Sequence, residues 1–198
     1  MGSEMCIRDS DTESEYEWVI DPLDGTQNYL HGFPYYCVSI GVKYNGRLEH
    51  AVIIDPVQQE QFSASRGSGA QLNNQRIRVS QTRRLADALL STGMPFRDPN
   101  DIKSWLRSYA AVLPRAQSVH RVGASALDMA YVAAGRYDGL WHLGLKPWDM
   151  CAGALLIQEA GGLVTDIEGK QDFLASGTVI CGTPKVHEKL LQLVQAYL

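Results

Sequence analysis

The sequence has little of what marks a disulfide-bonded, metal-thiolate or membrane-spanning protein. It contains four cysteines in 198 residues, without CxxC or zinc-finger spacing, and no apolar run approaches the length that crosses a bilayer. We find no charged-then-apolar leader, so the expected compartment is the cytoplasm. The net charge of −4 argues against broad attraction to anionic membranes, and we expect no direct contact with nucleic acid.

The composition that is present is that of a globular chain. Hydrophobic residues make up 45% and charged residues 20%, which is enough apolar material for a substantial core. Three cysteines, Cys37, Cys151 and Cys181, lie in apolar runs. We therefore expect them to be free, buried thiols.

The first part of the chain predicts an antiparallel meander. Residues 1–16 are polar and without periodicity, so we expect a leader that is disordered or foreign to the fold. An apolar strand then runs from Glu17 into a Pro/Gly turn, and two β-rich runs follow, separated by Asn45-Gly46, a strong hairpin signal. The runs EQFSASRG and QRIRVSQ extend the meander to about four or five strands.

The second part alternates between helices and strands. A helix over DIKSWLRSYAAVLP ends at Pro114, and a helix with a capping box at Ser125 and Asp128 follows a short strand. Further strands flank the helix DMCAGALLIQEAGG, and a closing helix begins at Thr183-Pro184. This alternation predicts an α/β sandwich over residues 17–198, with an antiparallel portion at about 17–115 and an α/β portion at about 116–198.

The most informative stretch is the loop DPLDGT at residues 21–26. Its Pro/Gly turn can aim Asp21, Asp24 and the Leu23 carbonyl at one point, and an all-oxygen ligand set suits Mg²⁺. Gly25 would let the backbone approach a phosphate, and the Thr26 hydroxyl could orient or deprotonate a metal-bound water. The plainer alternative is an Asx-type turn that caps a helix.

A third carboxylate, Asp149, opens a predicted helix in the segment KPWD. It lies at a strand-to-helix junction, where α/β layers gather ligands. An aspartate in the first turn of a helix is, alternatively, only a favourable cap. Asp149 decides nothing by itself and gains meaning only beside the loop at residues 21–26.

These motifs carry a resemblance to a known family. The segments WVIDPLDGTQNYLHGFP and PWDMCAGALLIQEAGG resemble the two signature segments of the inositol monophosphatase family, which are magnesium-dependent, lithium-sensitive phosphatases, and VGASALDMAYVAAGRYDG resembles its substrate-side segment. The resemblance runs from about Glu17 to the C-terminus. It implies the layered α-β-α-β-α sandwich of the inositol monophosphatase and fructose-1,6-bisphosphatase type, here lacking the first helices.

The resemblance also implies roles for single residues and a reaction, the direct in-line hydrolysis of a phosphate ester by a metal-activated water, without a phosphoenzyme. Asp24 and Thr26 would be catalytic. The implied ligands of Mg²⁺ are Asp21, Leu23, Asp24 and Asp149. The implied substrate-binding residues are Gly25, Thr26, Arg121, Gly123, Ala124, Ser125, His142 and Asp149. Arg121 is alternatively a solvated surface side chain, and Ser125 a helix N-cap.

Two features depart from the family pattern. The first helices and a metal-binding glutamate segment are missing, and Glu4, at about the right distance before Asp21, has unlike surroundings. We therefore expect a fragment of a longer protein, which leaves its activity open. His142 stands where a glutamate usually binds substrate hydroxyls, which weakens the case for inositol phosphate. The alternative for His142 is a strand residue that packs beside Trp141.

The leading functional hypothesis is a phosphomonoesterase for a small polyol phosphate such as inositol 1-phosphate. Within the same class, the substrate could be histidinol phosphate, fructose 1,6-bisphosphate or adenosine 3′,5′-bisphosphate. A second class is a non-catalytic, transcription-associated partner protein. The resemblance further suggests a homodimer.

Overall fold

The computed structural model describes residues 14–95 and 99–197. Its first sheet is an antiparallel meander of six strands in sequence order. These are β1 (Tyr16–Asp24), β2 (Cys37–Tyr44), β3 (Arg47–Asp55), β4 (Glu60–Ser65), β5 (Gly69–Leu72) and β6 (Gln75–Arg76). The short helix α1 (Thr26–Leu30) lies between β1 and β2.

The predicted hairpin between β2 and β3 is confirmed. Asn45 and Gly46 form its turn with φ angles of 48° and 77°, the left-handed conformation that this residue pair tolerates best. Alternation then sends one set of side chains, including Val19, Ile53 and Phe62, into the core. The meander thus presents one continuous apolar face to the rest of the molecule.

The second sheet is mixed and has the strand order β10-β11-β9-β7-β8. Its strands are β7 (Leu89–Thr92), β8 (Ser118–His120), β9 (Gly139–His142), β10 (Leu163–Thr165) and β11 (Val179–Gly182). Strands β7, β8 and β9 run parallel, so their carboxyl ends meet at one edge. Strand β7 and helix α2 (Pro99–Val112) precede residue 115 and yet belong with this sheet.

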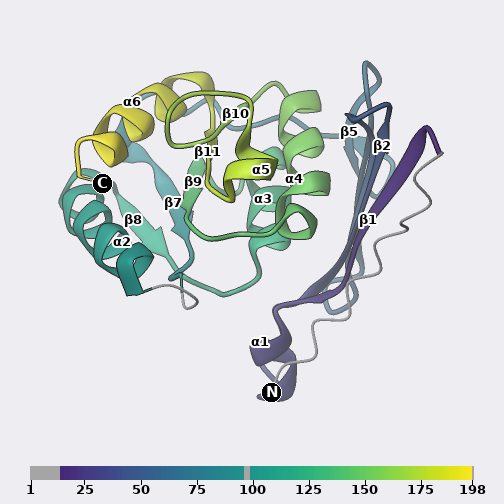
Figure 1. The fold of residues 1–198 in the computed structure, drawn as a ribbon, viewed down its shortest axis with the longest axis horizontal. Coiled ribbons are helices and arrows are strands. Elements are labelled where there is room, and N and C mark those ends of the chain that lie inside the picture. Colours follow the sequence, from purple (N-terminus) through teal and green to yellow (C-terminus); the bar gives the residue numbers. More distant parts are fainter. Residues whose placement is uncertain (1–13, 96–98, 198) are drawn as a thin grey trace.

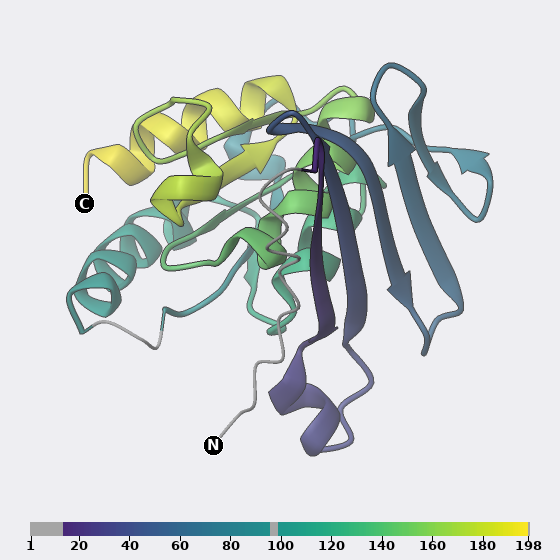
Figure 2. The same cartoon turned by 45° about the vertical axis from the view of Figure 1, so that its right-hand side comes forward.

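Helices fill the space between the sheets and cover the second one, as Figures 1 and 2 show. Helices α3 (Ser125–Ala133) and α4 (Pro147–Glu159) lie between the two sheets. Helices α2 and α6 (Pro184–Gln195) pack on the far face of the second sheet, and the short α5 (Phe173–Ser176) follows β10. The predicted layered α/β sandwich is confirmed, in the order sheet, helix pair, sheet, helix pair.

Two glycines allow the middle layer to pack closely. A Cβ atom on Gly41 of β2 would lie 2.4 Å from Sγ of Cys151, and one on Gly153 would lie 2.5 Å from Cβ of Met129. Helix α4 therefore approaches β2 on one side and α3 on the other at a distance that excludes even a methyl group. This contact fixes where the first turn of α4 meets the first sheet.

Several local predictions need correction. Helix α3 has Ala124 as its N-cap, without a side-chain cap, so the capping box at Ser125 and Asp128 is wrong. The Asp128 carboxylate instead bonds to side chains of other elements. Strand β6 ends at Arg76, because Val79 donates its N–H to Ala160 beyond α4 and the chain has left the sheet.

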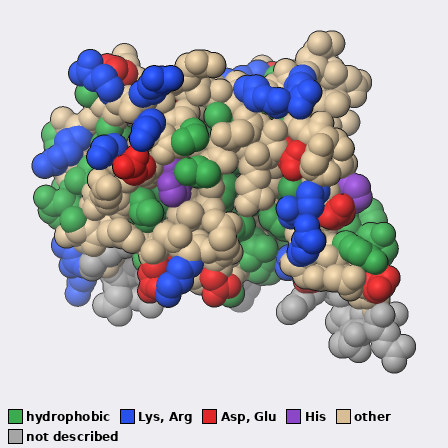
Figure 3. Space-filling view, turned by 90° about the horizontal axis from the view of Figure 1, so that it is seen from above, with side chains coloured by type: hydrophobic (Ala, Val, Ile, Leu, Met, Phe, Trp, Pro, Cys, Tyr) green, Lys and Arg blue, Asp and Glu red, His purple; other side chains and the backbone are tan. Residues whose placement is uncertain are grey.

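Other predictions hold or fall outside the described residues. Cys37, Cys151 and Cys181 are buried and free, as predicted, and Thr183 caps α6 by accepting the N–H of Val186. Of the predicted leader, residues 1–13 lie outside the described residues. None of the helices in residues 14–95 and 99–197 has the length and apolar character that a bilayer-spanning segment needs. The face in Figure 3 carries Lys and Arg side chains with acidic ones interspersed.

Candidate metal-binding site

The loop at residues 21–26 is shaped by an irregularity at the end of β1. Asp21 pairs with Ser39 and Asp24 with Cys37, so the register shifts between the two aspartates. Gly25 follows with φ of +86°, and a Cβ atom there would lie 2.9 Å from the Tyr35 carbonyl oxygen. Glycine is therefore required at residue 25 both by its backbone conformation and by lack of space.

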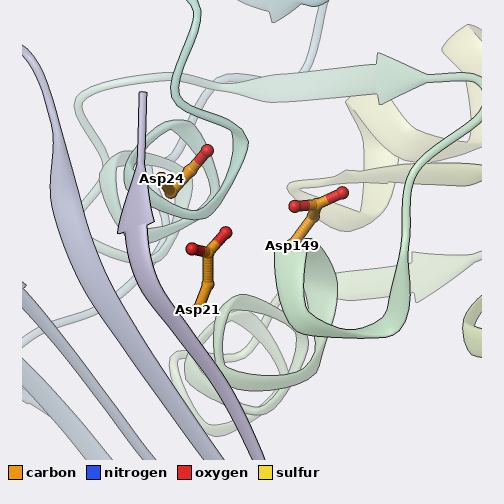
Figure 4. Close-up of side chains that lie close together, drawn as sticks. All are labelled: Asp21, Asp24 and Asp149. Atoms are coloured by element: carbon orange, nitrogen blue, oxygen red, sulfur yellow. The ribbon is translucent and has the colours of Figure 1, made fainter. Parts of the chain in front are cut away.

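Three carboxylates converge where this loop meets the first turn of α4. Asp21, Asp24 and Asp149 each offer an oxygen atom, and these atoms lie within 4.8 Å of one another (Figure 4). We call these three residues the acidic cluster. The position of Asp149 in the sequence indicated only a third carboxylate at a strand-to-helix junction, and the family resemblance implied that it is a ligand of Mg²⁺. The fold brings it beside two residues far away in sequence.

Backbone hydrogen bonds hold each carboxylate in place. Asp21 Oδ1 accepts the N–H of Leu23 at 3.0 Å, and Asp149 Oδ2 accepts the N–H of Lys146 at 2.8 Å. Asp24 Oδ2 accepts the N–H of Ala126 at 2.7 Å, at the start of α3. Asp149 therefore also caps its helix, so the plainer interpretation of this residue and its place in the cluster both hold.

The electrostatics of the acidic cluster favour a bound cation. Burial, and then the charges of Asp149 and Asp21, raise the pKa of Asp24 well above its usual range. A divalent cation would relieve this repulsion, and oxygen donors of this kind suit a hard ion such as Mg²⁺. The donor set of the cluster thus fits the predicted metal.

The other two predicted loop residues lie beside the cluster and contact each other. The Thr26 hydroxyl donates a 2.9 Å hydrogen bond to the Leu23 carbonyl oxygen, and both residues are half-buried. A carbonyl oxygen has two lone pairs, so this bond leaves the Leu23 oxygen able to accept a second partner.

The predicted substrate-side residues lie between β8 and α3, at the edge where the parallel strands end. Arg121 and Gly123 are exposed there, whereas Ala124 and Ser125 are buried at the start of α3. We call residues 121–125 the α3 entry loop. The Asp24–Ala126 hydrogen bond joins the end of this loop to the acidic cluster.

Sequence reasoning missed Asn28, which links the two loops. Its side-chain amide donates to the Tyr35 carbonyl at 2.8 Å and to the Val122 carbonyl at 3.0 Å. The only signal in the sequence was a polar residue inside the first signature segment. A side chain that bridges two distant loops cannot be distinguished there from one that faces solvent.

His142 lies deeper than the α3 entry loop. It ends β9 with its side chain buried, and its Nε2 lies 4.0 Å from Oδ2 of Asp128. Burial, followed by the positive charge of Arg121, lowers the pKa of His142 to about 4. The neighbouring Trp141 donates from Nε1 to Ser108 in α2, so these adjacent strand residues face opposite layers. Glu4 lies outside the described residues.

Comparisons with known proteins agree with this geometry. The family model described as the inositol monophosphatase family matches residues 1–198. A Pseudomonas aeruginosa protein named Nus factor SuhB is 52% identical over 194 residues, which span 97% of this chain and 72% of that protein. A Vibrio cholerae protein of the same name is 44% identical over 183 residues, or 92% of this chain and 68% of that protein.

Solved structures show the same fold. The extragenic suppressor protein suhB from Bartonella henselae superposes with a TM-score of 0.90 at 42% identity, over 94% of this chain and 72% of that one. The inositol monophosphatase from Anabaena (Nostoc) sp. PCC 7120 gives a TM-score of 0.89 at 38% identity, over 96% and 75% of the two chains.

Proposed function

Because the chain belongs to the inositol monophosphatase family, we propose that it is a magnesium-dependent phosphomonoesterase for a small polyol phosphate, with inositol 1-phosphate as the first candidate. The observation that carries this proposal is the acidic cluster, in which three carboxylates from β1 and α4 lie within 4.8 Å of one another. Such a cluster is costly without a cation, and it lies at the edge of an α/β fold where ligands commonly bind.

In this proposal Mg²⁺ is held by Asp21, Asp24, Asp149 and the Leu23 carbonyl oxygen. The bound ion would lower the pKa of a water molecule and neutralise charge on the phosphate and on the leaving alkoxide. Asp24 holds two partners at once, because its Oδ2 accepts the N–H of Ala126 while its charge faces the cluster.

The remaining proposed roles concern the substrate. Gly25 and Thr26 offer backbone N–H groups to the phosphate. The Thr26 hydroxyl, which donates a hydrogen bond to the Leu23 carbonyl oxygen, positions the attacking water. Asp149, Arg121 and the α3 entry loop (Gly123, Ala124 and Ser125) orient the polyol. His142 contributes to the floor of this site, where its side chain is buried.

The direct test is a phosphate-release assay with purified protein, MgCl₂ and four substrates, namely inositol 1-phosphate, histidinol phosphate, fructose 1,6-bisphosphate and adenosine 3′,5′-bisphosphate. We expect release from inositol 1-phosphate that needs Mg²⁺ and is inhibited by Li⁺. An Asp24→Asn variant assayed beside it should be inactive. Absence of release from all four substrates would overturn the phosphatase proposal.

A second candidate function is that of a transcription-associated partner protein, which the names of the relatives favour. The Pseudomonas aeruginosa and Vibrio cholerae proteins are both named Nus factor SuhB. The two functions separate in a bacterial strain that lacks the corresponding gene. A chain acting only as a partner should restore growth equally well as wild type and as Asp24→Asn, whereas a phosphatase-dependent role should be lost in the variant.

Two broader properties also belong to this proposal. We infer a cytoplasmic homodimer by analogy with the family. Sedimentation equilibrium of the purified chain tests the dimer, and a single species of 21.9 kDa would contradict it.

A further inference from the structure

A buried carboxylate lies beneath the candidate site and takes no part in the acidic cluster. Asp128 of α3 is fully buried. Its Oδ1 accepts a 2.5 Å hydrogen bond from the Tyr35 hydroxyl, and its Oδ2 accepts a 2.8 Å bond from Ser91 Oγ of β7. Asp128 thereby joins the middle helix layer to the segment before β2 and to the second sheet.

The group that faces Asp128 is His142. Its Nε2 lies 4.0 Å from Asp128 Oδ2 and has no hydrogen-bond partner within the described part of the chain. On its other side the ring lies against Gly93, where a Cβ atom would come within 2.3 Å of Cε1. The imidazole is thus confined between a bare stretch of backbone and the Asp128 carboxyl group.

The protonation preferences of the two groups are complementary. Burial raises the pKa of Asp128 to about 7, against the opposing hydrogen bonds from Tyr35 and Ser91. Burial, with a contribution from Arg121, lowers the pKa of His142 to about 4. Between about pH 4 and pH 7, one proton on Asp128 therefore leaves both groups neutral, and Nε2 of His142 is a nearby acceptor that has no hydrogen-bond partner in the described residues. An approach of about 1 Å would complete the hydrogen bond.

The other titratable groups around the pair do not change this assignment. Tyr35 donates a hydrogen bond to Asp128, and the charge of Asp128 acts on Tyr35, Tyr137 and Asp24. Burial raises the pKa of each phenol, so both phenols stay neutral. Arg121 is the charged group that acts on His142, and it opposes a positive imidazole. Between about pH 4 and pH 7 the pair therefore holds one proton.

The position of the pair links it to both loops of the candidate site. The Tyr35 carbonyl accepts the Asn28 amide and lies where any side chain on Gly25 would clash, so Tyr35 is the support of the loop at residues 21–26. Asp128 also belongs to the first turn of α3, whose Ala126 N–H binds Asp24.

Building on the phosphatase function proposed above, we propose that Asp128 is a positioning residue for that reaction. With His142 as its partner in a pair that shares one proton, it fixes Tyr35 and the start of α3. It thereby sets the alignment of the loop at residues 21–26 with the α3 entry loop. Neither side chain needs to touch the substrate for this role.

The kinetic test uses the 198-residue chain, saturating MgCl₂ and inositol 1-phosphate. Asp128→Asn should lower kcat about 10-fold, in the range that loss of a supporting hydrogen-bond partner typically costs, while KM and Mn²⁺ affinity measured by EPR change less than about 3-fold. Tyr35→Phe removes only the hydroxyl that donates to Asp128, and it should also lower kcat. It serves as the test if Asp128→Asn does not fold. Wild-type kcat in both variants would overturn the proposal.

The matched control is Asp166→Asn. Asp166 is also buried and accepts two backbone N–H groups, from Glu168 and Lys170, in the turn after β10. This variant should keep kcat within about 2-fold, because it alters a buried, doubly bonded aspartate away from the site. An equal loss of kcat in Asp166→Asn would mean that general destabilisation explains the effect, and the positioning role would be wrong.

The interaction between Asp128 and His142 can be tested without an activity assay. In long-range ¹H–¹⁵N spectra, the Nε2 resonance of His142 should shift on Asp128→Asn, and the stability losses of Asp128→Asn and His142→Gln should not add in the double variant. Additive losses and an unmoved resonance would contradict the pair. If wild type releases no phosphate, the proposed function and the role in catalysis both fail, whereas these two measurements still decide the pair.

Discussion

The carboxylate of Asp24 accepts a 2.7 Å hydrogen bond from the backbone N–H of Ala126, 102 residues further along the chain. The first N–H groups of a helix have no partner within that helix, so this bond stabilises the start of α3. The same carboxylate belongs to the acidic cluster. A cation bound at the cluster and the order of the α3 entry loop are therefore linked through one side chain.

Replacing Asp24 by asparagine should separate stability from function. An amide oxygen can still accept from Ala126, but the charge that Asp149 and Asp21 repel is gone. Because the raised pKa means that ionised Asp24 destabilises the fold, the metal-free variant should melt at a higher temperature than metal-free wild type near pH 7. Phosphate release should fall at least about 100-fold, and MgCl₂ should no longer raise the melting temperature.

Differential scanning fluorimetry with EDTA and with excess MgCl₂ measures this effect. Asp87→Asn is the control, because Asp87 forms an exposed ion pair with Arg84. Its melting temperatures should match those of wild type under both conditions. An equal response to MgCl₂ in wild type and Asp24→Asn would remove Asp24 from the ligand set.

Replacing Asn28 by alanine should loosen the link between the two loops. The Tyr35 and Val122 carbonyls would each lose a donor, at a stability loss of about 1–3 kcal/mol. We expect kcat/KM for inositol 1-phosphate to fall about 10-fold, measured by steady-state phosphate release. Asn73 also makes two bonds to backbone, with Gln61 and Gln59, so Asn73→Ala should lose stability without losing kcat/KM.

The Asp128–His142 pair predicts an unusual pH dependence of stability. Asp128 has a folded pKa of about 7, above its unfolded value, so it makes the fold less stable as pH rises from about 4 to 7. His142 has a folded pKa of about 4, below its unfolded value, so it makes the fold more stable as pH rises from about 4 to 6.5. The two slopes offset each other over most of this range.

Single variants should therefore expose slopes of opposite sign. Free energies of unfolding from urea titrations should fall with rising pH in His142→Gln and rise with pH in Asp128→Asn, each by up to about 1.4 kcal/mol per pH unit relative to wild type. Slopes of the same sign in the two variants would contradict a raised pKa for Asp128 together with a lowered pKa for His142.

Replacing Glu159 by glutamine should affect stability alone. The Glu159 carboxylate at the end of α4 accepts the N–H groups of Gly67 and Gly69, both at 2.8 Å, and so ties the β4–β5 turn to the helix. Glutamine keeps one acceptor oxygen and loses the charge, which should cost about 1–2 kcal/mol in urea unfolding. Phosphate release should stay at the wild-type level, and a loss of activity would contradict this purely structural role.

The sequence predicted those turns and helix ends whose conformation is decided by a few neighbouring residues. The hairpin at Asn45-Gly46 and the cap at Thr183 appear where the sequence puts them, because turn conformation and capping are decided within a few residues. Strand β5 and helix α5 escaped prediction, since four residues are too few to establish a period.

The acidic cluster was predictable only in part. Asp21 and Asp24 share one turn, and their spacing already indicated a common target. That Asp149 joins them depends on how α4 packs against the first sheet, which no local pattern encodes, so this part was implied by the family resemblance alone. Asp128 is the opposite case. Its spacing from Ser125 suggested a cap, but burial against Tyr35, Ser91 and His142 determines its bonds.

The acidic cluster depends on the absence of a side chain at Gly41. A methyl group at residue 41 would collide with Cys151, and Asp149 lies two residues before Cys151 in the same helix. Any side chain at residue 41 would therefore push the third carboxylate away from the other two. A search for functional residues by side-chain chemistry would pass over Gly41, although this residue determines how closely Asp149 approaches the other two carboxylates.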